Sequence, residues 1–464
     1  MIEALLNPPA VDRQIARLME QTSSEIGLLK SGDGQAQARA EEASGSKYDL
    51  EQLDHELDEY RKKEAKDLSG SNEPVWIPRD PVASLVLSAY DEFFDEIGLV
   101  RDLPAAARLA RSDIAVSGRE LEPAAIDFLE GRAGLAGRWL TKYGERDLRF
   151  LIWGAAAKVA TWLRRKHPFP PTAAPTFPIG DRDRLLLVGD WGSGIPRALQ
   201  VSTAMRSSLE QALREDRRCH VIHLGDVYYT GQPEEYKKRF LDPWPVRNHD
   251  SADKTSSWCL NGNHDMYSGG YGYFDTVLGD ARFARQSNSS FFCLENSNWQ
   301  ILGLDSAYDD GDLHGSQASW VQQVRSAQPN KAGILLTHHQ PFSSFESAND
   351  QLMDRLRPTL NADLVRAWFW GHEHRCAAYA PRPHIAYPRL VGHGGVPVWA
   401  PQSPAPSGVS YQYGTAEDDY LYRFGERFLR LGFAELTFEM KSIEVRYVNE
   451  LGIEAKKEGL EAKS

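Results

Sequence analysis

Five short segments of this sequence each end a run of apolar residues with side chains that can bind metal ions. An apolar run of four to eight residues that stops at glycine and a polar residue is typical of a buried strand leading into a loop. Ligands of open α/β sheets bind beyond the carboxyl ends of such strands, so we expect the five ends to meet. Their carboxylate, amide, phenol and imidazole groups suit two hard or borderline divalent or trivalent ions. The segments end at Asp190, Asp226–Tyr229, Asn263–Asp265, His338–His339 and His372–His374.

The stretches between these segments predict the elements that position them. Strand-like runs alternate with helical stretches, which is the order of a layered α/β domain. Shorter strands are expected at residues 433–440 and 442–447, where they would complete a second sheet. The helical stretches lie at residues 196–216, 233–240 and 316–327.

The remainder of the chain divides by composition. Residues 1–72 are polar and acidic and are expected to be partly helical. Residues 73–167 have helical periodicity and no catalytic cluster, so we predict a helical domain that supplies oligomer or partner contacts. Five prolines mark residues 168–182 as a semi-rigid linker. A catalytic domain is predicted at residues 183–450, followed by a frayed, charged tail at 451–464.

Composition limits the functions that the chain can have. The net charge of −12 gives no global attraction to nucleic acid or anionic lipid, so no nucleic-acid partner is expected. The longest apolar stretches, residues 82–100 and 148–163, contain charged residues and are too interrupted to span a bilayer. Residues 1–30 lack the pattern of a secretory signal, which favours a cytoplasmic protein. The four cysteines show no Cys-x-x-Cys spacing and are expected to be buried free thiols.

The five segments, taken together, resemble the calcineurin-like metallophosphoesterase superfamily over roughly residues 183–450. The pattern of that superfamily is Asp-x-His, Gly-Asp-x-x, Gly-Asn-His-Asp/Glu, a lone His, and Gly-His-x-His. The first segment here reads Asp190-Trp191-Gly192 and lacks the usual histidine, whereas the second has a tyrosine, Tyr229, three residues after Asp226. This paired change resembles the purple acid phosphatases, in which a tyrosine binds ferric iron. The resemblance implies a four-layer α/β/β/α sandwich, here with an N-terminal helical region.

The resemblance also implies a role for each candidate metal ligand. A tyrosinate ligand requires a strong Lewis acid, because a phenol with a pKa near 10 must lose its proton. The expected pair is therefore Fe(III) with Fe, Zn or Mn. Spacing favours Tyr229 as the ligand and leaves Tyr228 in the core. Asp226 would bridge the ions, with Asp190, Tyr229 and His374 completing the first site and Asn263, His372 and one of His338 and His339 completing the second.

Two adjacent histidines leave one ligand open. Successive side chains at a strand end point to opposite faces, so only one of His338 and His339 can bind the metal. The His-x-Pro arrangement of purple acid phosphatases selects His339, whereas the His-His-Pro-Pro form of other superfamily members selects His338. Both residues therefore stay candidates.

The resemblance assigns catalysis to His264 and Asp265. In the superfamily such a histidine faces the substrate phosphate, and its acidic neighbour holds its tautomer, so His264 could protonate the leaving oxygen. His393, beside two glycines that allow close approach of the backbone, is a further candidate contact to substrate. His223, inside a strand, is expected to be a core histidine.

The function that follows is hydrolysis of a small phosphate ester, with a phosphomonoester favoured. Two metal ions about 3.5–4 Å apart can activate a bridging hydroxide for in-line attack and clamp the phosphoryl group. A phosphodiesterase acting on cyclic nucleotides or phospholipid headgroups would use the same metals and stays an alternative. A non-catalytic binding scaffold is a second alternative.

Overall fold

The computed structural model describes residues 165–171, 174–396, 398, 411–414, 420–423 and 426–462, together with 84, 85, 88, 89 and 159. The chain divides into two compact units, of which the second contains residues 166–266 and 270–464. The five separate residues belong to the first unit and are helical. The predicted segment 1–72 and the rest of the predicted helical domain up to residue 164 lie outside the described residues.

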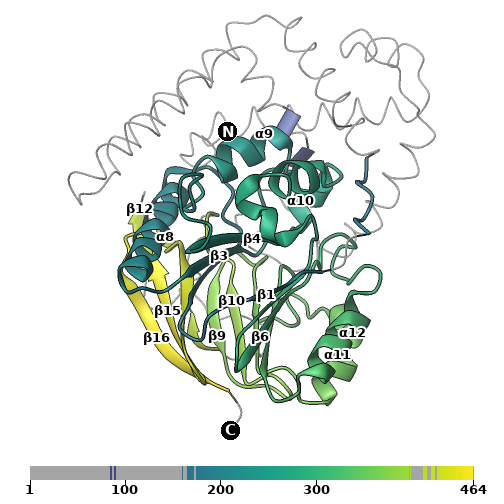
Figure 1. The fold of residues 1–464 in the computed structure, drawn as a ribbon. Coiled ribbons are helices and arrows are strands. Elements are labelled where there is room, and N and C mark those ends of the chain that lie inside the picture. Colours follow the sequence, from purple (N-terminus) through teal and green to yellow (C-terminus); the bar gives the residue numbers. More distant parts are fainter. Residues whose placement is uncertain are drawn as a thin grey trace, which may run out of the picture. The chain divides into compact units, whose positions relative to one another are not determined.

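Two mixed sheets form the framework of the second unit (Figure 1). In the described part of the chain, the larger sheet has eight strands in the order β1-β5-β6-β7-β8-β10-β9-β11. These are β1 (Thr176–Pro178), β5 (Phe292–Glu295), β6 (Trp299–Gly303), β7 (Ala332–Thr337), β8 (Ala367–Trp370), β9 (Cys376–Tyr379), β10 (Tyr387–Val391) and β11 (Tyr411–Gly414).

Among the residues that the structure describes, the smaller sheet has six strands in the order β16-β15-β14-β2-β3-β4. They are β2 (Arg184–Val188), β3 (Cys219–His223), β4 (Thr255–Cys259), β14 (Gly432–Glu439), β15 (Ser442–Asn449) and β16 (Glu454–Glu461). A separate hairpin pairs β12 (Tyr420–Arg423) with β13 (Glu426–Leu429). The strands predicted at residues 433–440 and 442–447 are therefore confirmed as β14 and β15.

Helices cover the outer faces of both sheets, while an apolar core fills the space between them. Helix α8 (Pro196–Arg214) contacts β2, β3, β14 and β15. Helices α11 (Gln317–Ala327) and α12 (Asp350–Asn361) share a core with the other sheet, in which Val321 and Leu352 pack with Trp368. Leu185 of one sheet and Phe369 of the other belong to the core between the sheets. This arrangement confirms the predicted α/β/β/α sandwich.

Short helical segments near the strand ends carry much of the candidate site. Helix α9 (Pro233–Glu235) continues into a π-helical turn at Tyr236–Leu241, and α10 spans Asn263–Tyr267. A second π-helical turn spans Gly272–Val277, and a 3-10 helix spans Ala281–Gln286. The helical stretches predicted at 196–216, 233–240 and 316–327 correspond to α8, to α9 with its π-helical turn, and to α11.

Parallel pairing brings the important strand ends to common edges. Strands β2, β3 and β4 are parallel neighbours, and so are β6, β7 and β8. Every residue of β2, β3, β4, β7 and β8 is buried, as expected for strands covered on both faces. Their carboxyl ends therefore deliver the following loop residues to the same region of the domain.

A buried polar network fixes the opposite ends of β2, β3 and β4. His220 lies with Nε2 2.9 Å from Asp183 Oδ2 and with Nδ1 2.5 Å from Ser256 Oγ. Asp183 precedes β2, whereas His220 and Ser256 are the second residues of β3 and β4. All three side chains are buried, so the contacts join the three strands that lead to the site.

Two predicted boundaries need correction. The segment 168–182 is more than a linker, because β1 pairs with β5 at the edge of the larger sheet and Ile179 enters the core. An edge position tolerates the proline at residue 178. The tail 451–464, expected to fray, contains β16, which pairs with β15 and buries Leu460. Charged residues suit such an edge strand because they face solvent and discourage further pairing.

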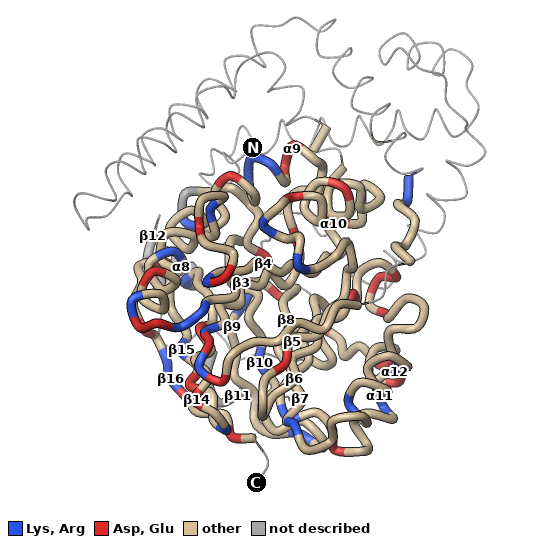
Figure 2. The backbone as a smooth tube through the Cα atoms, in the orientation of Figure 1, with Lys and Arg blue, Asp and Glu red and all other residues tan. Residues whose placement is uncertain are grey.

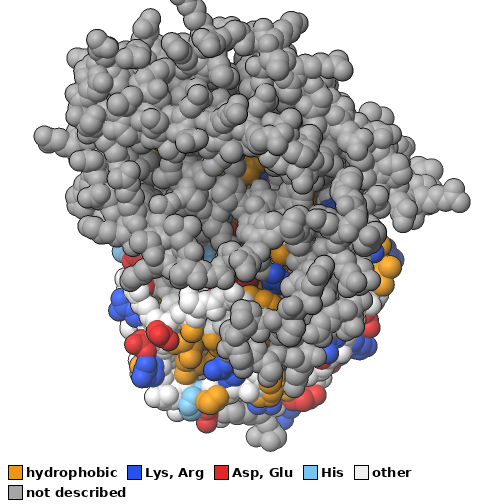
Figure 3. All heavy atoms as spheres, turned by 180° about the vertical axis from the view of Figure 1, so that it is seen from behind, with side chains coloured by type: hydrophobic (Ala, Val, Ile, Leu, Met, Phe, Trp, Pro, Cys, Tyr) orange, Lys and Arg blue, Asp and Glu red, His pale blue; other side chains and the backbone are white. Residues whose placement is uncertain are grey.

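The described surface carries both signs of charge. Lys and Arg are interspersed with Asp and Glu along the described chain (Figure 2), and the face in Figure 3 mixes acidic, basic and apolar side chains where it is described. No helix among the described residues is long and apolar enough to cross a membrane. All four cysteines are buried and free, as predicted.

Candidate metal centre

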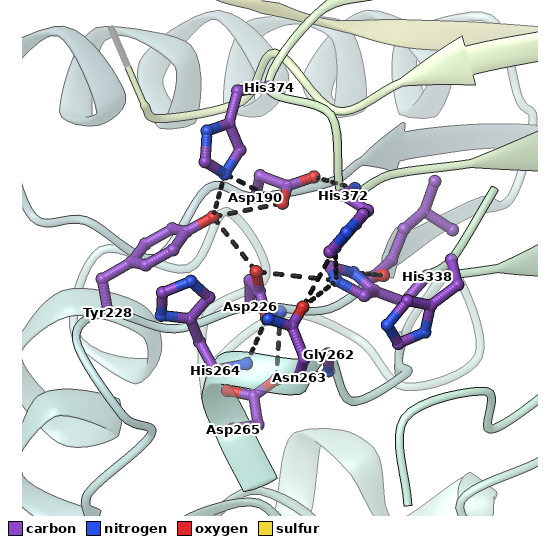
Figure 4. A network of polar contacts seen from close by, with 12 residues as sticks. Asp190, Asp226, Tyr228, Gly262, Asn263, His264, Asp265, His338, His372 and His374 are labelled. Carbon is purple, nitrogen blue, oxygen red and sulfur yellow. Dashed lines mark hydrogen bonds and ion pairs between the residues drawn. The ribbon is translucent and has the colours of Figure 1, made fainter. Parts of the chain in front are cut away.

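The loops after five buried strands converge on one polar cluster (Figure 4). Asp190, Asp226 and Asn263 follow β2, β3 and β4 of the smaller sheet, whereas His338 follows β7 and His372 and His374 follow β8 of the larger sheet. The strand ends therefore meet at one place, as the sequence predicted.

One half of the cluster gathers around Asn263. Its Oδ1 lies 2.9 Å from Nε2 of His338 and 3.0 Å from Nδ1 of His372, and these two nitrogens are 3.1 Å apart. Asp226 Oδ2 approaches the same His338 nitrogen at 3.5 Å. Three atoms that can bind a metal ion, together with a shared carboxylate, thus face one point, as a metal site requires.

The tautomer of His338 is set by the ring nitrogen that faces away from the cluster, Nδ1. Nδ1 donates to the carbonyl oxygen of Leu224 at 3.0 Å, which leaves the lone pair of Nε2 directed at the cluster. Burial and the neighbouring His339 lower the pKa of His338 well below 6.5. The ring is therefore neutral, which is the form of histidine that binds metal ions.

The other half of the cluster gathers around the hydroxyl group of Tyr228. This oxygen lies 3.1 Å from Asp190 Oδ1, 3.3 Å from Asp226 Oδ2 and 3.0 Å from His374 Nε2. His374 Nε2 is also 3.6 Å from Asp190 Oδ1. Asp226 therefore faces both halves, which is the position of a bridging ligand.

The two tyrosines exchange the positions that sequence spacing predicted for them. Tyr228, expected in the core, brings its hydroxyl group to the cluster, while the ring of Tyr229 lies 5.2 Å from the guanidinium carbon of Arg239. Glu235 accepts the backbone N–H of Tyr229 at 2.6 Å and that of Thr230 at 3.1 Å, and Arg239 donates to the Tyr228 carbonyl. These contacts turn the loop so that Tyr228 faces Asp226. The prediction that placed Tyr229 there is wrong.

A capping box at the start of α9 was the available sequence signal for this turn. Gln232 is the N-cap residue, and the side chain of Glu235 accepts its backbone N–H at 3.0 Å. A Glu at this position of a helix reaches back to the preceding loop. Sequence spacing from Asp226 alone does not reveal that constraint.

His264 and Asp265 lie at the cluster, but they do not form the predicted pair. His264 donates from Nδ1 to the carbonyl of Tyr229 at 2.8 Å, and its ring lies edge-on to Tyr228 with 4.7 Å between centroids. Asp265 instead accepts the backbone N–H groups of Asp226 at 3.0 Å, Val227 at 2.9 Å and Gly262 at 2.7 Å. The backbone carbonyl, not Asp265, holds the tautomer of His264.

His339 and His393 have other surroundings. His339 lies with Nδ1 3.2 Å from Ser306 Oγ and Nε2 3.2 Å from Asp310 Oδ1. Its ring stands 5.0 Å from that of His338, and its possible ligand atom lies within 4.8 Å of those of His338 and His372. The distances to Asn263 and Asp226 nevertheless favour His338 as the ligand.

Two other histidines are buried. His393 is buried beside β14, and its carbonyl accepts the N–H of Gly432 at 2.9 Å. Burial lowers the pKa of His393 to about 3. This position gives no support to a contact with substrate. His223 packs against Phe240 with 4.9 Å between ring centroids, as expected for a core histidine.

The electrostatics of the cluster fit a bound cation. Asp190 and Asp226 have exposed fractions of 0% and 1%. Burial and the nearby carboxylates of Asp190 and Asp265 raise the pKa of Asp226 well above 3.8. Burial and the nearby carboxylates of Asp190 and Asp226 raise the pKa of Tyr228 well above 10. A metal ion would relieve the repulsion and favour the charged form of each ligand, so the residues present fit such ions.

The backbone at the cluster adopts conformations that most residues avoid. Asp190 has a φ of 56°, Asp226 of 74°, His372 of 73° and His374 of 51°. Such strain persists only where the surrounding structure enforces it, and it concentrates at functional sites. Close packing adds a second restriction, because a Cβ on Gly262 would lie 2.1 Å from Asp226 Oδ1. The Gly-Asn-His motif therefore requires glycine at its first position for steric reasons.

The comparison with known families gives one match. The model of the calcineurin-like phosphoesterase family matches residues 183–376, a span that contains every residue of both halves of the cluster. No curated protein matches the sequence.

The solved structures that are similar to part of the chain include the following three. The first is GAP50, the anchor in the inner membrane complex of Plasmodium, at 12% identity over 61% of this chain and 90% of that one, with a TM-score of 0.46. A conserved uncharacterized protein and predicted phosphoesterase from Streptococcus pneumoniae TIGR4 has 10% identity over 60% and 98%, with a TM-score of 0.27. PhoD has 11% identity over 63% and 70%, with a TM-score of 0.35. Likeness at these scores carries no conclusion about activity.

The family match and the cluster agree with each other. Proteins of the family generally bind two metal ions, and the chain holds candidate ligand groups for them at Asp190, Asp226 and His338 and at His338, His339 and His372. The closer resemblance to purple acid phosphatases stays a prediction. Residues 183–376 match the model of a calcineurin-like phosphoesterase domain, and this match supports the activity of a metal-dependent phosphoesterase.

Proposed function

We propose that this chain hydrolyses small phosphomonoesters at a centre of two metal ions. The observation that carries the proposal is the position of Asp226, whose Oδ2 lies 3.3 Å from the Tyr228 hydroxyl and 3.5 Å from His338 Nε2. One carboxylate oxygen thus serves both halves of the cluster. The ligands would be Asp190, Tyr228, His374 and the shared Asp226 on one side, and Asn263, His338, His372 and Asp226 on the other.

The side chains around the cluster have separate tasks in this reaction. Two bound ions supply Lewis-acid stabilisation of the phosphoryl group and an activated water molecule. The carbonyl of Tyr229 keeps a proton on Nδ1 of His264, so proton transfer to a leaving oxygen would use Nε2. Asp265 holds the backbone of Asp226 and Gly262 together and thereby keeps the bridging carboxylate in place.

A paired assay of a monoester and a diester tests the proposed function. Full-length protein loaded with metal should hydrolyse p-nitrophenyl phosphate with a higher kcat/KM than bis(p-nitrophenyl) phosphate. A chelator should abolish the activity, and added metal ions should restore it.

Other outcomes of that assay would support the alternatives. Faster hydrolysis of the diester would favour a phosphodiesterase that acts on cyclic nucleotides or phospholipid headgroups. Protein that contains two ions per chain yet hydrolyses neither ester would favour a binding scaffold.

The metal pair that we propose is Fe(III) with Fe, Zn or Mn. The support is a phenol placed within 3.3 Å of two buried carboxylates, because a trivalent ion readily removes the proton of a phenol. Oxidised, iron-loaded protein should then be pink to purple. Tyr228→Phe should bleach the colour, whereas Tyr229→Phe, at the adjacent position, should keep it. Visible absorption spectra of the three proteins at matched iron content check this.

The two tyrosine variants separate the possible errors. If Tyr229→Phe loses the colour and Tyr228→Phe keeps it, the iron ligand is Tyr229, the residue that sequence spacing selected. Colourless, fully active protein that holds only manganese or zinc would refute the iron assignment and would leave Tyr228 as a neutral neighbour of the ligands.

A further inference from the structure

The two histidines of the Asn263 half are anchored at their outer nitrogens by different groups. His338 uses the backbone carbonyl of Leu224, at 3.0 Å. His372 directs Nδ1 to the cluster, so its outer nitrogen is Nε2, which lies 3.6 Å from Oε2 of Glu346. Histidines that bind metal ions usually donate their outer N–H to a carboxylate or a carbonyl, which fixes the orientation of the ring.

A set of hydrogen bonds made by Glu373 and Ser343, here called the Ser343–Glu373 brace, holds Glu346 near His372. Glu373 lies between His372 and His374 in sequence and is buried. Its Oε2 accepts the indole N–H of Trp370 at 2.9 Å, and its Oε1 accepts the hydroxyl hydrogen of Ser343. The brace therefore ties the loop after β7 to the loop after β8.

Ser343 passes this constraint to Glu346. Its Oγ accepts the backbone N–H of Phe345 at 2.7 Å and that of Glu346 at 2.9 Å. A serine that accepts N–H groups two and three residues later fixes a turn. The turn places the Glu346 side chain, with an exposed fraction of 17%, against that of His372, with 15%.

We infer that Glu346 is a positioning residue for the metal ion bound by His372, and that the Ser343–Glu373 brace sets its place. Its carboxylate fixes the ring orientation of His372 with Nδ1 toward Asn263. It also adds negative charge beside one ion, while the other ion keeps its own ligands, Asp190, Tyr228 and His374. Glu346 therefore controls the affinity of one metal ion of the pair. This inference rests on the proposed two-metal centre.

Metal titration of the full-length protein tests the inference without an activity readout. Metal-free protein is titrated with Zn(II) in one series, and with Zn(II) after addition of one equivalent of Fe(III) in a second. The ions bound per chain are measured by calorimetry and elemental analysis. Loss of such an outer partner typically costs about 10–100-fold in metal affinity. Glu346→Ala should therefore weaken one of two binding events by that factor and leave the other unchanged. Ser343→Ala should act in the same direction, and Glu346→Gln, which keeps an acceptor oxygen, should lose less.

A charge control and a stability measurement separate positioning from structural damage. Glu210 has a side chain that is 47% exposed on α8, so Glu210→Gln should bind both ions as the unaltered protein does. The thermal midpoints of metal-free Glu346→Ala and of the metal-free unaltered protein should agree.

Each contrary outcome has its own meaning. If the unaltered protein binds fewer than two ions in both series, the proposed function fails, and this inference fails with it. If it binds two and Glu346→Ala binds both equally well, the inference alone fails. Equal weakening of both sites, or a lower thermal midpoint of the metal-free variant, would also overturn it, because Glu346 would then be a structural residue.

Discussion

Asp226→Asn should abolish phosphoester hydrolysis and reduce the bound metal to less than two ions per chain. The carboxylate faces both halves of the cluster through Oδ2, while Oδ1 accepts the backbone N–H of His264 at 2.9 Å. An amide has no negative charge and presents an NH2 group where one of these oxygens lies. Elemental analysis and the p-nitrophenyl phosphate assay measure the two losses.

The metal-free form of this variant gives a check against unfolding. Burial and Asp190 disfavour the charge on Asp226 when no ion is bound, which is why the pKa of Asp226 is raised. Removal of that charge should leave the thermal midpoint of the metal-free protein unchanged or raise it. A lower midpoint would show that the lost activity reflects a damaged fold.

Asp216→Asn is the matched control for this substitution. Asp216 has a φ of 53°, close in conformation to Asp226 at 74°, and its side chain is 89% exposed beside Lys254. The same chemical change on the same kind of backbone should leave metal content and turnover unaltered. Full activity of Asp226→Asn with two ions bound would contradict a bridging role for Asp226.

The sequence was sufficient to locate the strand ends because burial on both faces demands uninterrupted apolar runs. Leu185 to Val188 and Ile334 to Leu336 are such runs, and each stops where a polar loop begins. The strands that precede Asp190 and His338 could therefore be assigned without knowing how the sheets pair. The edge strand β16 was not predicted because its Lys and Glu residues face solvent. Leu460 is the one buried residue of this strand, so its sequence shows no alternation of apolar and polar residues.

The fine geometry of the site depended on contacts that the spacing of the candidate ligands does not reveal. Tyr228 reaches the cluster because Glu235 and Arg239 hold the backbone of the loop. The role of Asp265 was misjudged for a similar reason, because its partners are backbone N–H groups rather than the neighbouring imidazole of His264. Apart from the capping box of Gln232 and Glu235, these side chains bind backbone groups without a recognisable sequence pattern.

His264→Ala should lower turnover by about 10²–10⁴-fold, the usual contribution of a general acid, while both metal ions stay bound. Alanine keeps the backbone N–H that donates to Asp226 Oδ1 at 2.9 Å, so the bridging carboxylate should hold its position. What is lost is the imidazole, whose ring lies edge-on to Tyr228 at 4.7 Å between centroids and whose Nδ1 donates to the Tyr229 carbonyl. Steady-state kinetics and elemental analysis of the same preparation separate the two quantities.

The size of the loss should depend on the leaving group. An alkoxide needs a proton as the bond to phosphorus breaks, whereas p-nitrophenolate leaves readily without one, so the decrease in kcat should be larger for an alkyl phosphate. His249→Ala, at an exposed position, is the control and should retain the turnover of the unaltered protein on both esters. An equal decrease for both esters would mean that His264 binds the phosphoryl group instead of donating a proton. Near-normal turnover on the alkyl phosphate would exclude both roles, because no step of the reaction would then depend on the imidazole.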